Sequence, residues 1–183
     1  SMETGLTGLN EPSIDGLTEN QSLEEAQAII KASLETFSPD RLLRIAHAMR
    51  YQLSLQEIQE ITKYDMWYLE QIKAIVDSEE RLKQDGVPQD KLTFLQVKKE
   101  GFSDARIAEL TETTEQVVRD KRHELGCRPV YKKVDTCAGE FESHSSYMYS
   151  CYEGNGFQEP DCESLPSDRK KVVILGGGPN RIG

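Results

Sequence analysis

The spacing of apolar residues predicts that most of this chain is helical. Between residues 21 and 126 the apolar positions recur every three or four residues, the period of a helix that buries one face. We expect helices at residues 23–36, 39–49, 55–61, 66–85, 91–100, 104–110 and 114–125. Residues 1–20 show no sustained period and are interpreted as an N-terminal coil segment.

Local signals mark where these helices begin. In a capping box, a Ser or Thr side chain and a Glu or Gln three residues later satisfy free backbone amides at the helix start. Such pairs are Ser22 with Glu25, Ser54 with Glu57, and Thr113 with Gln116. Pro39 is expected at the first position of the second helix, where its missing amide costs little.

Two parts of the helical region share one pattern. The first copy begins at Ser54 and continues with Ile58, Ile61, Thr62 and Leu69, and the second begins at Ser103 and continues at the same offsets with Ile107, Leu110, Thr111 and Val118. Each copy is a short capped helix, a turn and a longer helix. Because one such pair cannot bury both of its apolar faces alone, we expect residues 21–126 to form one multi-helix, two-lobed domain.

The character of the chain changes after Gly126. Residues 127–170 mix extended-type segments with aromatic residues and then with Gly, Asn, Pro and Ser, which is typical of an extended inter-domain strap and linker. We expect the aromatic residues to dock this strap onto another part of the protein. In residues 171–183 an apolar run precedes three glycines, which predicts the first strand and glycine loop of a truncated α/β domain. The predicted fold class is therefore mainly α, followed by a strap and one terminal strand.

The charge of the chain narrows the classes of function. A formal net charge of -10 weighs against general affinity for nucleic acid or anionic membranes, which requires a basic face. No apolar run is long enough to span a bilayer, and the start of the chain has no signal-peptide pattern.

The histidines and cysteines of the sequence form no recognisable catalytic or metal-binding pattern. The three histidines are His47, His123 and His144, and the four cysteines are Cys127, Cys137, Cys151 and Cys162. The histidines match no known motif and the cysteines include no closely spaced pair, so we expect free thiols and no metal site. The acidic pair Glu79–Glu80 is interpreted as a solvated helix face, and Trp67 and Tyr68 as core or interface anchors.

A helix-turn-helix DNA-binding regulator is the alternative function. In such a motif the second helix offers basic or amide side chains to the base edges. The second copy of the repeat carries Arg119, Lys121, Arg122 and His123 on that helix. Acidic residues lie on the same helix and the whole chain is acidic, so a solvated face or a protein contact is the favoured interpretation.

The glycine loop at the end of the sequence resembles nucleotide-binding loops only in part. Gly176 and Gly178 fit the first two glycines of a dinucleotide fingerprint, but Arg181 occupies the place of the third. A Walker-type phosphate loop needs Lys followed by Ser or Thr, which this loop does not have. The loop is better evidence for a buried strand with a tight turn than for nucleotide binding.

Several stretches of the sequence, in order, resemble one protein family. They are Glu3-Thr4-Gly5-Leu6-Thr7-Gly8, Gly101-Phe102-Ser103-Asp104-Ala105-Arg106-Ile107-Ala108, Pro129 to Ala138, Glu140-Phe141, Tyr147-Met148-Tyr149-Ser150, and Val173-Ile174-Leu175 followed by Gly176-Gly177-Gly178-Pro179-Asn180-Arg181-Ile182-Gly183. These stretches resemble the large subunit of carbamoyl-phosphate synthetase, of the bacterial or plastid type. The resemblance covers the middle helical oligomerisation domain and the first strand of the second synthetase half.

The resemblance implies a function for the longer enzyme and a supporting role for this part of it. Enzymes of the family are ligases that make carbamoyl phosphate from bicarbonate, glutamine-derived ammonia and two ATP, with magnesium or manganese, for arginine and pyrimidine biosynthesis. The resemblance implies that this part of the enzyme is non-catalytic and contains no cofactor and no catalytic residue. The implied partners are the remaining domains of the large subunit, the small glutaminase subunit and further copies in a homo-oligomer, in the cytoplasm. By the same resemblance Arg181 lines the tunnel for the carbamate intermediate, or else it is a structural arginine paired with a carboxylate.

Overall fold

The computed structural model describes residues 5–18, 20–142, 144–158 and 160–174. Within these ranges the helices are α1 (Leu23–Glu35), α2 (Arg41–Arg50), α3 (Leu55–Thr62), α4 (Met66–Asp85), α5 (Lys91–Lys99), α6 (Asp104–Leu110) and α7 (Glu115–Glu124), and the strands are β1 (Val130–Lys133) and β2 (Met148–Cys151). The predicted mainly α fold class is confirmed.

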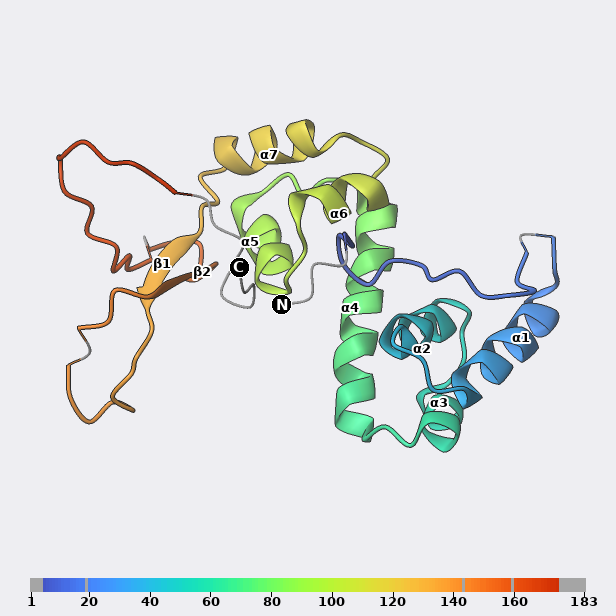
Figure 1. Ribbon diagram of the computed structural model, residues 1–183. Coiled ribbons are helices and arrows are strands. Elements are labelled where there is room, and N and C mark those ends of the chain that lie inside the picture. Colours follow the sequence, from blue (N-terminus) through green and yellow to red (C-terminus); the bar gives the residue numbers. More distant parts are fainter. Residues whose placement is uncertain (1–4, 19, 143, 159, 175–183) are drawn as a thin grey trace.

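Two lobes share the long helix α4 (Figure 1). The first lobe consists of α1, α2, α3 and the beginning of α4, and the second lobe consists of the end of α4 with α5, α6 and α7. Each lobe has its own apolar core, and α4 contributes Leu69, Ile72 and Val76 to the first core and Leu82 to the second. Because α4 is one continuous helix of 20 residues, it sets the distance between the two cores.

The repeat is longer than the sequence pattern indicates, because it also includes the helix before each copy. After α2, Gln52 has a φ of 63° and Leu53 donates its amide to Ala48 at 3.1 Å. After α5, Gly101 has a φ of 95° and Phe102 donates its amide to Val97 at 3.4 Å. Both helices therefore end in the same left-handed turn, after which a buried apolar side chain enters the core. Each repeat unit is thus a set of three helices: α2, α3 and the start of α4, then α5, α6 and α7.

Two predicted helix starts need correction. The second helix begins at Arg41 and not at Pro39, because the Arg41 amide closes a turn onto the Ser38 carbonyl at 3.2 Å. The cap of α7 is Thr114 and not Thr113: the Thr114 hydroxyl accepts the Val117 amide at 3.4 Å. The capping boxes at Ser22 and Ser54 form as predicted.

Replacing Thr114 by alanine is expected to lower the free energy of unfolding by about 1 kcal/mol, because an orphan amide of α7 loses its acceptor. Thr113→Ala is the matched control and should change it by less than about 0.5 kcal/mol. Urea denaturation followed by helical circular dichroism measures both values. If the Thr113 variant lost more free energy of unfolding than the Thr114 variant, Thr113 would be the capping residue, as the sequence pattern predicts.

The strap contains a two-stranded sheet that its composition did not indicate. Strands β1 and β2 pair antiparallel, with Val130 opposite Cys151 and Lys133 opposite Met148. Tyr152, directly after β2, packs against the second lobe, and its ring lies 5.3 Å from the Lys98 ammonium group. Other aromatic residues of the strap are exposed: Phe141, Tyr147, Tyr149 and Phe157. Tyr152 is therefore an aromatic residue of the strap that docks on the second lobe, where Cys127 of the strap is also part of the apolar core.

The terminal strand predicted at residues 171–183 lies largely outside the described residues. Residues 171–174 are described, and they form no strand with the rest of the described chain. Their apolar side chains are exposed: Val172, Val173 and Ile174. The strand and its α/β domain stay predictions.

Candidate functional site at the junction of the two lobes

A buried glutamate of α4 lies where the two lobes meet. Glu79 is 1% exposed, although its neighbour Glu80 faces solvent. The interpretation of Glu79–Glu80 as a solvated face is thus wrong for Glu79. The cause is its helical phase: Glu79 lies three residues after Val76 and three before Leu82, on the stripe of α4 that the cores cover.

Two arginines, one from each lobe, bind this carboxylate. Arg50, the last residue of α2, donates to Glu79 Oε2 at 2.6 Å from Nη2 and 2.9 Å from Nε. Arg106, on α6, donates to Oε1 at 2.8 Å from Nη2 and 3.2 Å from Nε. Each carboxylate oxygen therefore receives two donors of one guanidinium, which fixes the direction of each arginine. The pair of contacts ties α2 to α6 through α4.

The segment before α1 completes this junction. Glu11 lies 3.2 Å from the Arg106 guanidinium and 3.8 Å from that of Arg50. Arg50 also donates to the Leu9 carbonyl, and the Ser103 hydroxyl of the second lobe donates to the Thr7 carbonyl at 3.0 Å. The N-terminal coil therefore crosses α4, and its backbone carbonyls accept hydrogen bonds from both lobes (Figure 1).

The charges of the junction stabilise one another in their ionised forms. Burial alone would raise the pKa of Glu11, but the hydrogen bond from Arg106 and the charges of Arg50 and Arg106 outweigh it and lower that pKa. Burial alone would lower the pKa of Arg106, but its hydrogen bonds to Glu11 and Glu79 raise it. Both pKa shifts favour the charged forms of Glu11 and Arg106, so this pair is suited to holding geometry and not to acid–base catalysis.

His47, one of the candidate residues of the sequence, is buried beside this junction. Its ring lies 4.9 Å from that of Tyr51, and its Nδ1 has no hydrogen-bond partner among the described residues. Burial and the nearby charge of Arg50 lower the pKa of His47. The structure therefore places it as a neutral packed histidine.

The basic residues proposed for DNA contacts are largely engaged within the protein. Arg122 is buried and donates to Asp104 at 2.8 Å. Arg119 pairs with Glu115, and Lys121 lies 3.2 Å from Glu124. Arg128 contacts the ring of His123, and desolvation and then the neighbouring positive charge of Arg128 lower the pKa of that histidine below its ordinary value. The face of α7 is thus electrostatically mixed, which disfavours the DNA-binding alternative.

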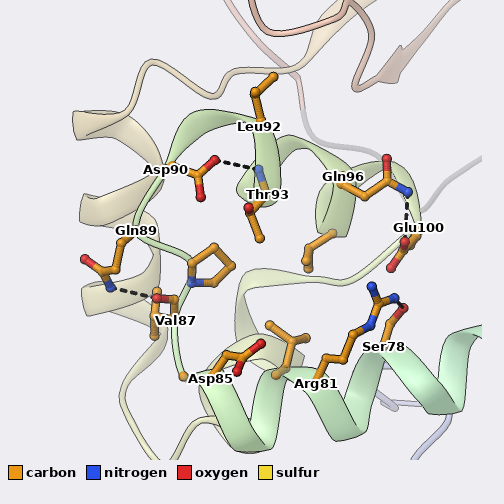
Figure 2. A pocket seen from close by; sticks show the side chains of 14 residues that line it. Ser78, Arg81, Asp85, Val87, Gln89, Asp90, Leu92, Thr93, Gln96 and Glu100 are labelled. Carbon is orange, nitrogen blue, oxygen red and sulfur yellow. Dashed lines mark hydrogen bonds between the residues drawn. The ribbon is translucent and has the colours of Figure 1, made fainter.

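A cleft of about 570 Å³ opens between the end of α4 and α5 (Figure 2). Polar side chains on its walls bind one another: Arg81 donates to Ser78 at 2.6 Å, and Gln96 donates to Glu100 at 2.8 Å. Asp90 caps α5 by accepting the Thr93 amide at 2.9 Å. The charged residues of the lining are one arginine, Arg81, and three acids, Asp85, Asp90 and Glu100, and the hydrogen bonds above already engage Arg81, Asp90 and Glu100 within the protein.

The remaining expectations meet the structure in different ways. Trp67 and Tyr68 are not core residues, since both are more than half exposed and pack edge to face with ring centroids 5.0 Å apart. Arg181 lies outside the described residues. In the part of the chain that the structure describes, no three His, Cys, Asp or Glu side chains gather where they could hold a metal ion. None of the described helices is long and apolar enough to cross a membrane.

Comparisons with known proteins assign this architecture to a family. Residues 1–126 match the family model described as carbamoyl-phosphate synthetase large chain, oligomerisation domain. The whole chain is 49% identical to the carbamoyl phosphate synthase large chain of Brucella melitensis, 48% to that of Rhizobium meliloti and 44% to that of Pseudomonas aeruginosa. It spans 15% of the length of the first two proteins and 16% of the third.

Proposed function

Because the chain belongs to the oligomerisation-domain family of the carbamoyl-phosphate synthetase large chain, we propose that it is the helical spacer and assembly domain of such an enzyme. The longer enzyme would be a ligase that makes carbamoyl phosphate from bicarbonate, glutamine-derived ammonia and two ATP. This chain would hold the two synthetase halves in a fixed relation and offer a surface for self-association.

One observation carries the spacer role: a single helix and one buried carboxylate connect the two lobes. Helix α4 runs through both lobes, and Glu79 binds an arginine of each at 2.6 and 2.8 Å. A body built in this way transmits position between its ends, because bending it at the middle would separate buried charges.

The ATP and magnesium or manganese of the proposed enzyme would be bound by domains other than this one. The described helices do not fit a metal–nucleotide site, because their carboxylates and histidines form no ligand cluster. The remaining large-chain domains, a small glutaminase subunit and further copies of the chain are the proposed partners, and the cytoplasm is the proposed location. The tunnel role of Arg181 stays a prediction.

The proposal is tested by exchanging domains with a relative. The corresponding segment of the Pseudomonas aeruginosa large chain, to which this chain is 44% identical, is replaced by residues 1–183. We expect the chimera to synthesise carbamoyl phosphate at a rate within a few-fold of the unmodified enzyme, and this chain alone to show no bicarbonate-dependent ATP hydrolysis. A folded chimera without activity, or ATP hydrolysis by this chain alone, would contradict the spacer role.

The assembly role is tested separately by sedimentation equilibrium. We expect the weight-average mass of the isolated chain to rise with concentration above its 20.7 kDa monomer mass. A constant monomer mass across the accessible concentration range would remove self-association from the proposal and leave the spacer role in place.

A further inference from the structure

A cavity in the first lobe has an unusual charge for so acidic a protein. It has a volume of about 590 Å³ and lies where the ends of α1 and α3 meet the start of α2. Its lining residues are Phe37, Ser38, Pro39, Arg41, Leu42, Thr62, Lys63 and Tyr64. Two of them are cations and none is an acid, although the chain has 32 acidic residues and a net charge of -10.

Arg41 forms the base of this cavity. Its side chain is held by Nη2, which donates to the carbonyl of Leu34 at 3.2 Å and to that of Thr62 at 3.4 Å. These carbonyls belong to the last turns of α1 and α3, where the helix dipole carries partial negative charge. The guanidinium also lies over the Phe37 ring at 4.4 Å, which is a cation–π distance. Arg41 is therefore fixed in position before any partner arrives.

The charge of Arg41 is not matched by an acid. The residue is 8% exposed, and its buried Nε has no hydrogen-bond partner within the described chain. Among the described residues, no carboxylate lies within ion-pair distance of its guanidinium; the neighbouring Asp40 binds Arg44 at 3.0 Å instead. By contrast, the buried Arg50, Arg106 and Arg122 each bind a carboxylate. A buried cation that has only carbonyls and rings around it favours an added anion.

Lys63 brings a second positive charge to the same cavity. It is the C-cap residue of α3, and its φ of 60° places it in the left-handed region at the turn into α4. Its ammonium group is exposed and makes no ion pair with the residues described here. A carboxylate has two acceptor oxygens and can therefore bind one guanidinium and one ammonium group at the same time.

The rim of the cavity is apolar and open to solvent. Phe37 is 86% exposed and Leu42 is 45% exposed, so the cavity does not enclose a small molecule. Exposed aromatic side chains beside an ordered arginine are the combination that dominates the affinity of protein–protein interfaces. The shape therefore favours a segment of protein over a free metabolite.

We propose that this cavity is a docking site for an acidic protein segment. An Asp or Glu carboxylate of that segment pairs with Arg41 and Lys63, and an adjacent apolar side chain packs on Phe37 and Leu42. The site does not depend on the proposed enzyme, because it rests on charge complementarity and on the exposed rim alone.

The test titrates the ¹⁵N-labelled chain with a ten-residue peptide whose centre is Leu-Glu-Leu, and with the same peptide carrying Leu-Gln-Leu. NMR follows the backbone amides and the Arg41 Nε–H signal. We expect the glutamate peptide to shift the signals of Arg41, Lys63 and Phe37 and to bind at least fivefold more tightly than the glutamine peptide. Equal affinities, or shifts elsewhere on the surface, would overturn the proposal.

Variants separate binding from folding. Lys63→Glu reverses an exposed charge. It is expected to lower the affinity for the glutamate peptide at least tenfold without unfolding the chain. The matched control is Lys83→Glu, which makes the same charge change in the last turn of α4 and should bind like the original chain. Arg41→Lys keeps the charge but loses the planar fork and should weaken binding, whereas unchanged binding by both cavity variants would contradict the proposal.

Two further measurements distinguish other occupants. Inorganic phosphate, added at the same concentrations, should not shift the Arg41 signal; saturable phosphate binding would reassign the cavity to a small anion. If Lys63→Glu abolished self-association in the sedimentation experiment, while neither peptide bound the original chain, the occupant would be a second copy of this chain and the proposed partner would be wrong.

Discussion

Replacing Glu79 by glutamine is expected to lower the free energy of unfolding by about 3–5 kcal/mol, the usual cost of leaving a buried charge without its partner. The side chains of Arg50 and Arg106 are only 7% and 5% exposed and both depend on this carboxylate. Glutamine retains the size of the side chain but loses its negative charge, so two buried guanidinium groups would face each other with only the half-exposed Glu11 and Glu109 to offset them. Urea denaturation measures the change.

Glu80→Gln is the matched control, one residue away on the same helix. Glu80 pairs with Lys83 on the surface, where both side chains remain well exposed. Exposed pairs of this kind contribute little, so its loss should change the free energy of unfolding by less than about 0.5 kcal/mol. If the free energy of unfolding fell by an equally small amount in both variants, the junction would not connect the lobes energetically. The spacer role would then lose its physical basis.

Features fixed by near neighbours could be predicted from the sequence. The helices after Ser22 and Ser54 start where expected, because a capping box joins residues only three positions apart. Ile58 and Ile107, matched in the sequence repeat, are both fully buried in corresponding short helices. The two-lobed helical fold follows from such local signals together with the apolar period.

Features that depend on distant pairs could not be predicted in the same way. The spacing of Glu79 from Val76 and Leu82 indicates a buried face of α4, but its partners Arg50 and Arg106 lie 29 and 27 residues away in the sequence. The hairpin pairs Val130 with Cys151 across a long connection, and its alternation is too short to signal a strand. Arg122 looked available for DNA, because its partner Asp104 lies on another helix.

Replacing Asp104 by asparagine is expected to lower the free energy of unfolding by about 3–5 kcal/mol. Asp104 begins α6 and accepts from Lys98 of α5 at 2.9 Å and from Arg122 of α7 at 2.8 Å. All three side chains are at most 10% exposed. The substitution would leave two buried cations with one neutral amide. Asp120→Asn, on the exposed face of α7, is the matched control and should change the free energy by less than about 0.5 kcal/mol.

The pH dependence of the Asp104 variant distinguishes loss of charge from loss of packing. Burial alone would raise the pKa of Asp104, but hydrogen bonds from Arg122 and Lys98 lower it below its ordinary value of 3.8. A lowered folded-state pKa stabilises the protein above the ordinary value, and this stabilisation is lost as the pH falls through the lowered pKa. The difference between the original chain and Asp104→Asn should therefore be constant from pH 8 to about pH 5 and should shrink below about pH 4. A difference that stayed constant down to pH 3 would mean that packing of the side chain, and not its charge, holds α5, α6 and α7 together.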